Sequence, residues 1–199
     1  MALETTASYP VYFAVSEDNK IANWRPLAHG VMAIPHLIVG SILHFVAQIC
    51  VTISWFAILF TGKMPEGLAN IIVMAQRYWL RAQGFYLGLT EQYPPFEFEA
   101  QQADPGNYAI RFDANVQLED RNRVTVFFRM FMMIPIMIFA YLVMVGIGIV
   151  AFIAWFAVLF TGEYPVGMRN FVIKGFRLLA RVGAYGSLLT DQYPPFSLD

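Results

Sequence analysis

The chain has 199 residues, of which 58% are hydrophobic and only 14% are charged. Soluble domains average about 45–50% apolar and about 25% charged residues, so this composition predicts a membrane protein. The formal net charge of −1 argues against a strongly basic nucleic-acid-binding surface, and we expect no nucleic acid partner. The single cysteine, Cys50, excludes an intramolecular disulfide.

Short strands are expected ahead of each apolar stretch of the chain. Residues 9–15 and 108–116 are rich in β-branched and aromatic residues, with alternation in the second, which is typical of strands. These two strands could share a small sheet. Residues 96–99 alternate in the same way and resemble an exposed strand.

Two long runs, at 27–60 and 124–160, are almost free of charge. About 20 apolar residues are enough to cross a bilayer core of about 30 Å, so each run predicts a membrane helix with length to spare. Pro35 and Pro135 stand at matching places and are expected to kink the helix or to split off a short first helix. We therefore predict a helix near 28–34 and a spanning helix over about 36–60.

A membrane hairpin is the alternative for these runs. Its tip would lie at Gly40 and Ser41 in the first run, or at Gly146 and Gly148 in the second. Each arm would then be too short to span the bilayer, so the chain would enter and leave by one face.

An amphipathic second helix follows each apolar run, at 66–90 and at 166–190. Its polar and small residues recur at steps of three, four or seven, which places them on one side of the helix. They are Asn70, Arg77, Arg81, Gly84 and Gly88 in the first helix, and Asn170, Lys174, Arg177 and Arg181 in the second.

The chain contains an internal repeat. Residues 53–96 align without a gap with residues 153–196, and 20 of the 44 positions are identical. A shared period of this length indicates tandem structural units. We divide the chain into a first repeat at 1–99, a linker at 100–107 and a second repeat at 108–199.

The predicted fold is therefore a mainly α integral membrane protein of two tandem repeats. Each repeat has a short strand lead, a long Pro-kinked membrane helix or hairpin, and an amphipathic second helix. If each repeat crosses twice, the strands meet on one side and the four crossings form two parallel pairs. If each crosses once, the repeats lie upside down to each other and their strands separate. We favour an arrangement that keeps the strands together.

The location predicted from these features is the cell membrane, with a multi-pass or hairpin-inserted chain. Positively charged residues are concentrated on the side of the strands, and positive residues favour the cytoplasm. We therefore expect the strands and both termini to be cytoplasmic.

The arginine stripe is the sharpest polar feature of the repeat. No acidic residue lies within the membrane segments to pair with these cations, which suggests contact with lipid phosphate or another anion, or simple anchoring at the headgroups. The candidate contacts are Arg77, Arg81, Lys174, Arg177 and Arg181.

Aromatic residues near the predicted membrane boundaries form a second candidate set, because amphipathic rings and cations anchor helices at headgroup level. The Tyr-Pro-Pro-Phe segments are expected to leave the membrane as rigid, extended chains. The candidate interface anchors are Trp24, Arg25, Trp55, Tyr93, Phe96, Trp155, Tyr193 and Phe196.

The only three histidines, His29, His36 and His44, are spaced so that they could share one side of a helix. A metal or haem site would need further ligands converging on them. No carboxylate is near in sequence and the second repeat has no histidine, so we favour packing roles. We predict no cofactor and no metal.

The chain resembles a bacterial membrane family known as domain of unknown function 4389. The resemblance rests on residues 55–67, with Trp-Phe-Ala…Phe-Thr-Gly and Pro…Gly, and on residues 91–96, with Tyr-Pro-Pro-Phe. The second repeat departs from this pattern at Glu163, Tyr164 and Val166. The resemblance implies a membrane protein and supplies no catalytic residues.

No nucleophile, base and oxyanion set is apparent in the sequence, and no glycine-rich phosphate loop. We therefore expect a non-catalytic membrane protein that is an accessory subunit or a lipid-organising scaffold. The alternative is a small transporter or channel-like unit with an arginine-lined path. Expected partners are membrane lipids, with other protein chains or further copies of this chain.

Overall fold

The computed structural model describes residues 9–16 and 19–198. Two long helices, α1 (Arg25–Thr61) and α4 (Arg129–Thr161), each precede a shorter helix, α2 (Glu66–Tyr86) and α5 (Val166–Gly186). A five-residue helix, α3 (Arg123–Phe127), leads into α4. The strands β1 (Val11–Val15) and β2 (Ile110–Ala114) complete the described elements. The mainly helical prediction with a small shared sheet is confirmed.

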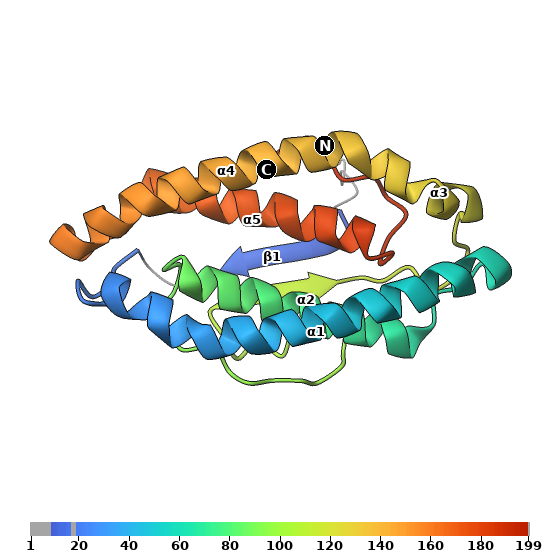
Figure 1. Ribbon diagram of the computed structural model, residues 1–199, viewed down its shortest axis with the longest axis horizontal. Helices are drawn as coiled ribbons and strands as arrows, with labels where there is room; N and C mark the ends of the chain where they lie inside the picture. The colour runs from blue at the N-terminus through green and yellow to red at the C-terminus, as the bar shows by residue number, and fades with distance from the viewer. Residues whose placement is uncertain (1–8, 17–18, 199) are drawn as a thin grey trace, which may run out of the picture.

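The long helices run in opposite directions and meet at both ends of the molecule (Figure 1). At one end, Trp155 Nε1 donates a hydrogen bond to the Pro26 carbonyl at 2.8 Å. At the other end, Trp55 Nε1 donates to the Val126 carbonyl at 3.1 Å. The start of α1 therefore meets the end of α4, so the parallel arrangement considered for repeats that cross twice is wrong.

The strands pair although the repeats are inverted. β1 and β2 form an antiparallel two-stranded sheet in which Phe13 is opposite Phe112. The sequence argument placed the strands beyond the helix ends, where inversion would separate them. They lie instead beside the middle of the helices, where an inverted pair can meet (Figure 1).

Each strand packs on the amphipathic helix of the other repeat. β1 contacts α5, and β2 contacts α2. The inner face of the sheet buries Phe13, Ile110 and Phe112, whereas Tyr12 and Arg111 are exposed on the outer face. The two sequence repeats are thus intertwined in space.

Both apolar runs form helices that continue past their prolines. α1 includes Pro35 and α4 includes Pro135, so neither proline splits off a first helix. A proline removes one donor from the helical ladder, and the rest of the ladder can continue around it. In the second repeat the break comes earlier, at Phe128 between α3 and α4.

The glycines proposed as hairpin tips lie within continuous helices, so the hairpin alternative is wrong. A Cβ atom on Gly40 would lie 2.9 Å from Cε3 of Trp79 on α2. A Cβ atom on Gly146 would lie 3.1 Å from Cζ of Phe171 on α5. These glycines allow the helices of each repeat to approach closely.

Residues 96–99 form no strand. This segment folds back over α1 and α2, with the Phe98 ring stacked 5.7 Å from the ring of Tyr78. Its alternation therefore reflects packing of aromatic rings and solvation of the glutamates between them.

The outer faces of α1 and α4 are mostly apolar, although the polar side chains Ser41, His44, Gln48 and Thr52 are exposed along the middle of α1. At 37 and 33 residues they are the two helices, within the described part of the chain, long and apolar enough to cross a membrane. At about 1.5 Å per residue they measure roughly 55 and 50 Å. Exposed side chains include Val31, Ile38, Phe45, Phe56 and Phe60 on α1, and Phe131, Ile138, Leu142, Ile149 and Phe160 on α4.

Candidate functional site

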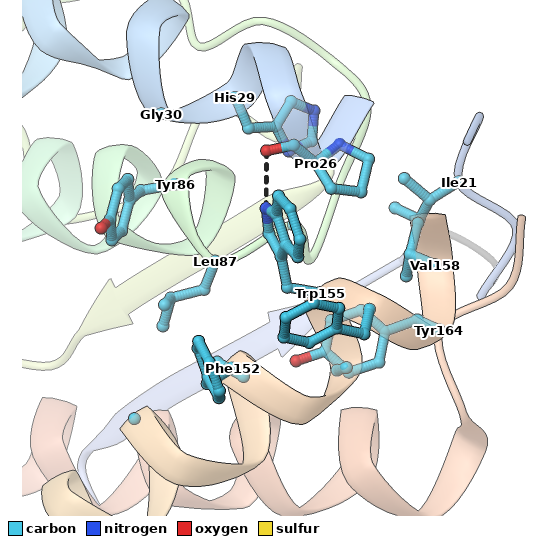
Figure 2. Close-up of a pocket in the computed structure, with 15 residues that line it drawn as sticks. Ile21, Pro26, His29, Gly30, Tyr86, Leu87, Phe152, Trp155, Val158 and Tyr164 are labelled. Atoms are coloured by element: carbon cyan, nitrogen blue, oxygen red, sulfur yellow. Dashed lines mark hydrogen bonds between the residues drawn. The ribbon is translucent and has the colours of Figure 1, made fainter. Parts of the chain in front are cut away.

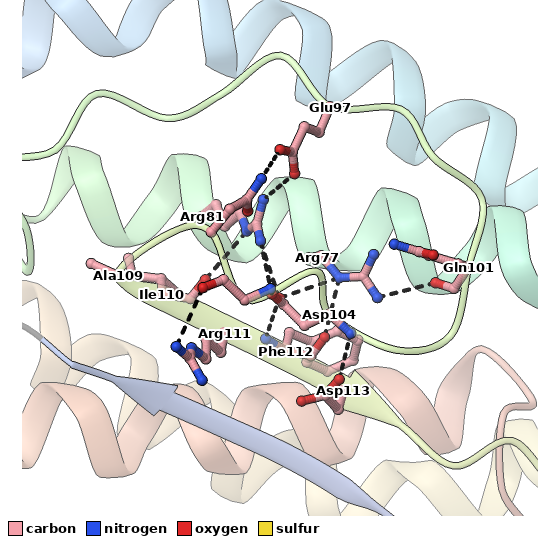
Figure 3. Close-up of polar contacts among 12 residues, drawn as sticks. Arg77, Arg81, Glu97, Gln101, Asp104, Ala109, Ile110, Arg111, Phe112 and Asp113 are labelled. Carbon is pink, nitrogen blue, oxygen red and sulfur yellow. Dashed lines mark hydrogen bonds and ion pairs between the residues drawn. The ribbon is translucent and has the colours of Figure 1, made fainter.

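The first-repeat arginines bind the free edge of β2 (Figure 3). Arg77 Nε donates to the Phe112 carbonyl and Arg81 Nε to the Ile110 carbonyl, each at 3.2 Å. Residues four apart on a helix are separated by about 6 Å, and alternate residues on a strand by about 6.8 Å. The spacing of the arginines therefore matches the spacing of the outward carbonyls.

Asp104 completes this edge from the linker. Its carboxylate lies 3.0 Å from Arg81 Nη2 and 3.4 Å from Arg77 Nε, and it accepts the Phe112 N–H at 3.0 Å. Glu97 lies 2.9 Å from Arg81 Nη1. The expectation that no carboxylate pairs with these arginines is wrong, because residues 97–104 fold back across α2.

The second repeat uses its arginines on the edge of β1. Arg177 Nε donates to the Phe13 carbonyl at 3.2 Å. The Arg181 guanidinium lies 5.9 Å from the centre of the Tyr9 ring. Lys174 is exposed beside them. The five candidate phosphate contacts are thus divided between two sheet edges instead of forming one cluster.

The predicted interface anchors take two different positions. Trp24 is 56% exposed, and the Arg25 guanidinium lies 4.8 Å from its ring centre. Trp55 and Trp155 are half-buried and join the two repeats through the hydrogen bonds at the helix ends.

The Tyr-Pro-Pro-Phe segments pack back onto the long helices. Tyr93 and Phe96 lie 4.6 and 4.2 Å from the His36 ring centre. In the second repeat, Tyr193 Oη donates to the Met132 carbonyl at 3.2 Å, and Phe196 lies 5.7 Å from the Phe139 ring. These segments therefore fix the amphipathic helix of each repeat against its long helix.

The histidines separate into three environments. His36 is buried, with Nδ1 2.8 Å from Tyr78 Oη. His44 is exposed, with its ring 6.0 Å from that of Trp79. His29 is 3% exposed and lines a pocket. Within residues 9–16 and 19–198 no group of three or more His, Cys, Asp or Glu side chains could hold a metal ion.

The pocket around His29 has a volume of about 630 Å³ and lies where α1 begins and α4 ends (Figure 2). The hydrogen bond from Trp155 to Pro26 is part of its wall. Small residues make much of its lining: Gly30, Gly88, Gly148, Ala151 and Ala154. Large apolar residues supply the rest, among them Leu87, Phe152, Phe156, Val158 and Tyr164.

A polar cluster occupies the equivalent place in the second repeat. Arg129, which corresponds to His29, donates to the Tyr185 and Thr190 carbonyls at 2.7 Å. Its Nη2 lies 2.5 Å from Asp191, which also binds Arg121 Nη2 at 2.7 Å. Burial by itself would raise the pKa of Asp191, but hydrogen bonds from Arg121 and from the Asn122 N–H lower it below its ordinary value.

The pocket escaped the sequence analysis, although the repeat contained a signal for it. Gly30 corresponds to Met130, and Gly88 to Leu188. Gly88 and Leu188 have the same left-handed backbone, with φ of 72° and 64°, so the two positions differ only in the volume of the side chain. A search of the aligned repeats for positions with a small residue in one repeat and a large residue in the other could have located the cavity.

The two repeats each match the family model described as domain of unknown function (DUF4389), over residues 25–97 and 123–197. These matches cover most of the chain, which therefore belongs to that family. No curated protein matches the chain. No solved structure matches it either.

Substitution of Arg81 tests the sheet-edge network. Arg81→Met would leave the carboxylate of Asp104, 1% exposed, without its closest cation. Breaking a buried ion pair in this way costs about 3–5 kcal/mol of unfolding free energy. Denaturant unfolding in detergent, followed by circular dichroism, would measure the loss.

Lys63→Met is the matched control, because Lys63 pairs with Glu119 where both side chains are exposed. We expect no measurable loss from this variant, since exposed pairs contribute little. Equal effects of the two substitutions would contradict a structural role for Arg81.

The Asp191 cluster predicts acid sensitivity. Because the folded-state pKa lies below the ordinary value of 3.8, the stabilisation is complete above that value and is lost as pH falls through the folded pKa. Asp191→Asn should therefore destabilise the protein more at about pH 6 than at about pH 3. Unfolding free energies of both proteins at the two pH values measure this, and a gap that stays constant or widens in acid would contradict the assignment.

Proposed function

We propose that this DUF4389 member is a non-catalytic membrane protein that lies along one side of the bilayer and organises the surrounding lipid. The observation that carries the proposal is the separation of charge between its two broad faces. Arg77, Arg81 and Arg177 donate to strand carbonyls, whereas no exposed residue of α1 or α4 is an Asp, Glu, Lys or Arg.

Helical geometry supports this separation. Arg77 and Arg81 point to the sheet, and residues 79, 83 and 86 lie about half a turn around α2 from them. These are Trp79, Gln83 and Tyr86, all partly or fully exposed. The corresponding residues of α5 are Leu179, Gly183 and Gly186, which also carry no charge. This face and the outer faces of α1 and α4 are suited to lipid contact.

A crossing orientation fits the charges less well. The sheet lies beside the middle of the long helices (Figure 1), and Arg111 of β2 and Glu99 of the segment that covers α2 are exposed. With the long axis across the bilayer they would face hydrocarbon, at a cost of at least about 2.5 kcal/mol for the arginine. The long helices also exceed the core thickness of about 30 Å.

The arginine-lined transporter loses its main support. Arg77 and Arg81 direct their donors to oxygen atoms of the chain itself, so they are not free to line a path. The accessory-subunit role stays a prediction, because it requires a partner chain. In the lying orientation the sheet and loops face one compartment, which the positive-inside rule favours as the cytoplasm.

Charges added to the outer faces should weaken membrane binding. Ile38 and Ile138 are 58% and 61% exposed, so Ile38→Glu with Ile138→Glu leaves the core intact. We expect the double variant to float with phosphatidylethanolamine–phosphatidylglycerol vesicles at least about ten-fold less than the wild type. It should also lose the wild type's effect on the anisotropy of a bilayer probe.

Arg111→Glu is the control, because Arg111 is exposed on the outer face of the sheet. It should bind vesicles as the wild type does. Unchanged flotation of the double variant would contradict the proposal. A wild type that binds vesicles without altering lipid order would also contradict it.

Cysteine labelling distinguishes a molecule that lies along the membrane from one whose long axis crosses it. Lys63 and Glu163 follow the ends of α1 and α4, at opposite ends of the molecule. With Cys50 replaced by Ala, single cysteines at positions 63, 107 and 163 should all resist an impermeant reagent in intact cells and react after permeabilisation. Labelling of 63 and 163 from opposite sides would mean that the long axis crosses the membrane.

A further inference from the structure

The pocket between the start of α1 and the end of α4 contains a buried polar atom that the protein leaves unpaired. His29 is 3% exposed, and its Nε2 has no hydrogen-bond partner among the described residues. Buried polar atoms are normally paired, so an unpaired one on a cavity wall points to a ligand. We propose that this pocket binds a fatty acid, with the acyl chain in the cavity and the carboxylate at His29. This inference rests on the proposed membrane function and extends it.

The cavity suits a single acyl chain. Its volume of about 630 Å³ falls within the range of about 300–1,000 Å³ typical of small-molecule sites. Apart from His29, its side chains are apolar, small or aromatic, and Tyr164 Oη is a second buried polar atom without a partner among the described residues. A Cβ atom added to Gly30 or Gly148 would meet nothing within 4 Å, which leaves open space along the wall.

Next to His29, but outside the residues that line the pocket, lies a second unpaired donor. Arg25 lies one turn before His29 on α1, and its Nε likewise has no partner among the described residues. The nearby Glu91 carboxylate is engaged by the Ala22 N–H at 2.5 Å. A carboxylate that accepts hydrogen bonds from a guanidinium and an imidazole makes stronger contacts than a neutral group would.

The pocket is continuous with the surface assigned to lipid. Phe152 and Phe156 line it and are 67% and 42% exposed on α4. Tyr86, also in the lining, is 47% exposed on the uncharged face. A fatty acid could therefore enter sideways from the bilayer without passing through water.

The second repeat shows why the ligand is needed at one end only. There Arg129, in place of His29, satisfies the carbonyls of Tyr185 and Thr190 and pairs with Asp191. Leu188 replaces Gly88 and is buried, whereas Met130, which replaces Gly30, is 79% exposed. The place that the first repeat leaves open is thus occupied in the second repeat by Arg129 and Leu188.

Tryptophan quenching provides the test. Trp155 lies in the pocket wall, and Trp55 has the equivalent position at the other end. In a maltoside detergent, a variant that keeps only Trp155 should be quenched saturably by a fatty acid brominated along its chain. A variant that keeps only Trp55 should show the weak, linear quenching of micelle partition. Equal quenching of the two variants would overturn the proposal.

A variant that blocks the cavity provides a second test of the proposal. Gly30→Met introduces a long side chain at a glycine of the lining where a Cβ atom meets nothing within 4 Å, so folding should be retained and saturable quenching of Trp155 lost. Gly67→Met is the matched control, because a Cβ atom at Gly67 also meets nothing within 4 Å, away from the pocket. Quenching that persists in Gly30→Met would overturn the assignment of the cavity.

The head group is tested with the methyl ester of the same brominated acid. The acid should bind at least about ten-fold more tightly than the ester, and His29→Leu should remove most of that difference. Equal binding of acid and ester to the wild type would overturn the carboxylate assignment. Vesicle flotation of Gly30→Met should equal that of the wild type, so failure of the pocket is distinguishable from failure of membrane binding.

Discussion

The fold depends on the way in which arginines close the free edges of a two-stranded sheet. A two-stranded ribbon by itself is marginally stable and leaves a row of backbone groups unpaired on each side. Here Arg77, Arg81 and Asp104 pair the free edge of β2, and Arg177 binds β1. Because each strand belongs to the other repeat, these bonds also hold the two repeats together.

The side chains of the two repeats differ in an informative way at the two ends of the molecule. One end holds a buried ionic cluster of Arg121, Arg129 and Asp191, which satisfies its own carbonyls and charges. The other end has Ile21 and His29 at the matching positions and is a pocket. A cluster of paired charges stabilises without a ligand, whereas a mainly apolar cavity with His29 Nε2 and Tyr164 Oη unpaired leaves polar atoms available to one.

The long helices give the molecule a mainly apolar surface apart from the polar sheet edges. Among the exposed residues of α1 and α4 none is an Asp, Glu, Lys or Arg, and Arg77 and Arg81 of α2 donate to carbonyls of the sheet. This division gives a physical basis for an orientation along the membrane, since only the sheet side needs water. The arginine stripe of this strongly apolar chain donates to backbone carbonyls of the sheet.

The sequence by itself determined the elements: the repeat, the two strand leads, the long apolar helices and the striped helices all follow from local composition and period. Only the tertiary structure decided direction and pairing. Arg77 lies in a striped helix and Asp104 lies in the linker. No local sequence pattern predicts that a linker carboxylate contacts a helix arginine. The inverted packing, the strand exchange and the His29 pocket arise from contacts between repeats, where energies depend on distance in space and not on separation along the chain.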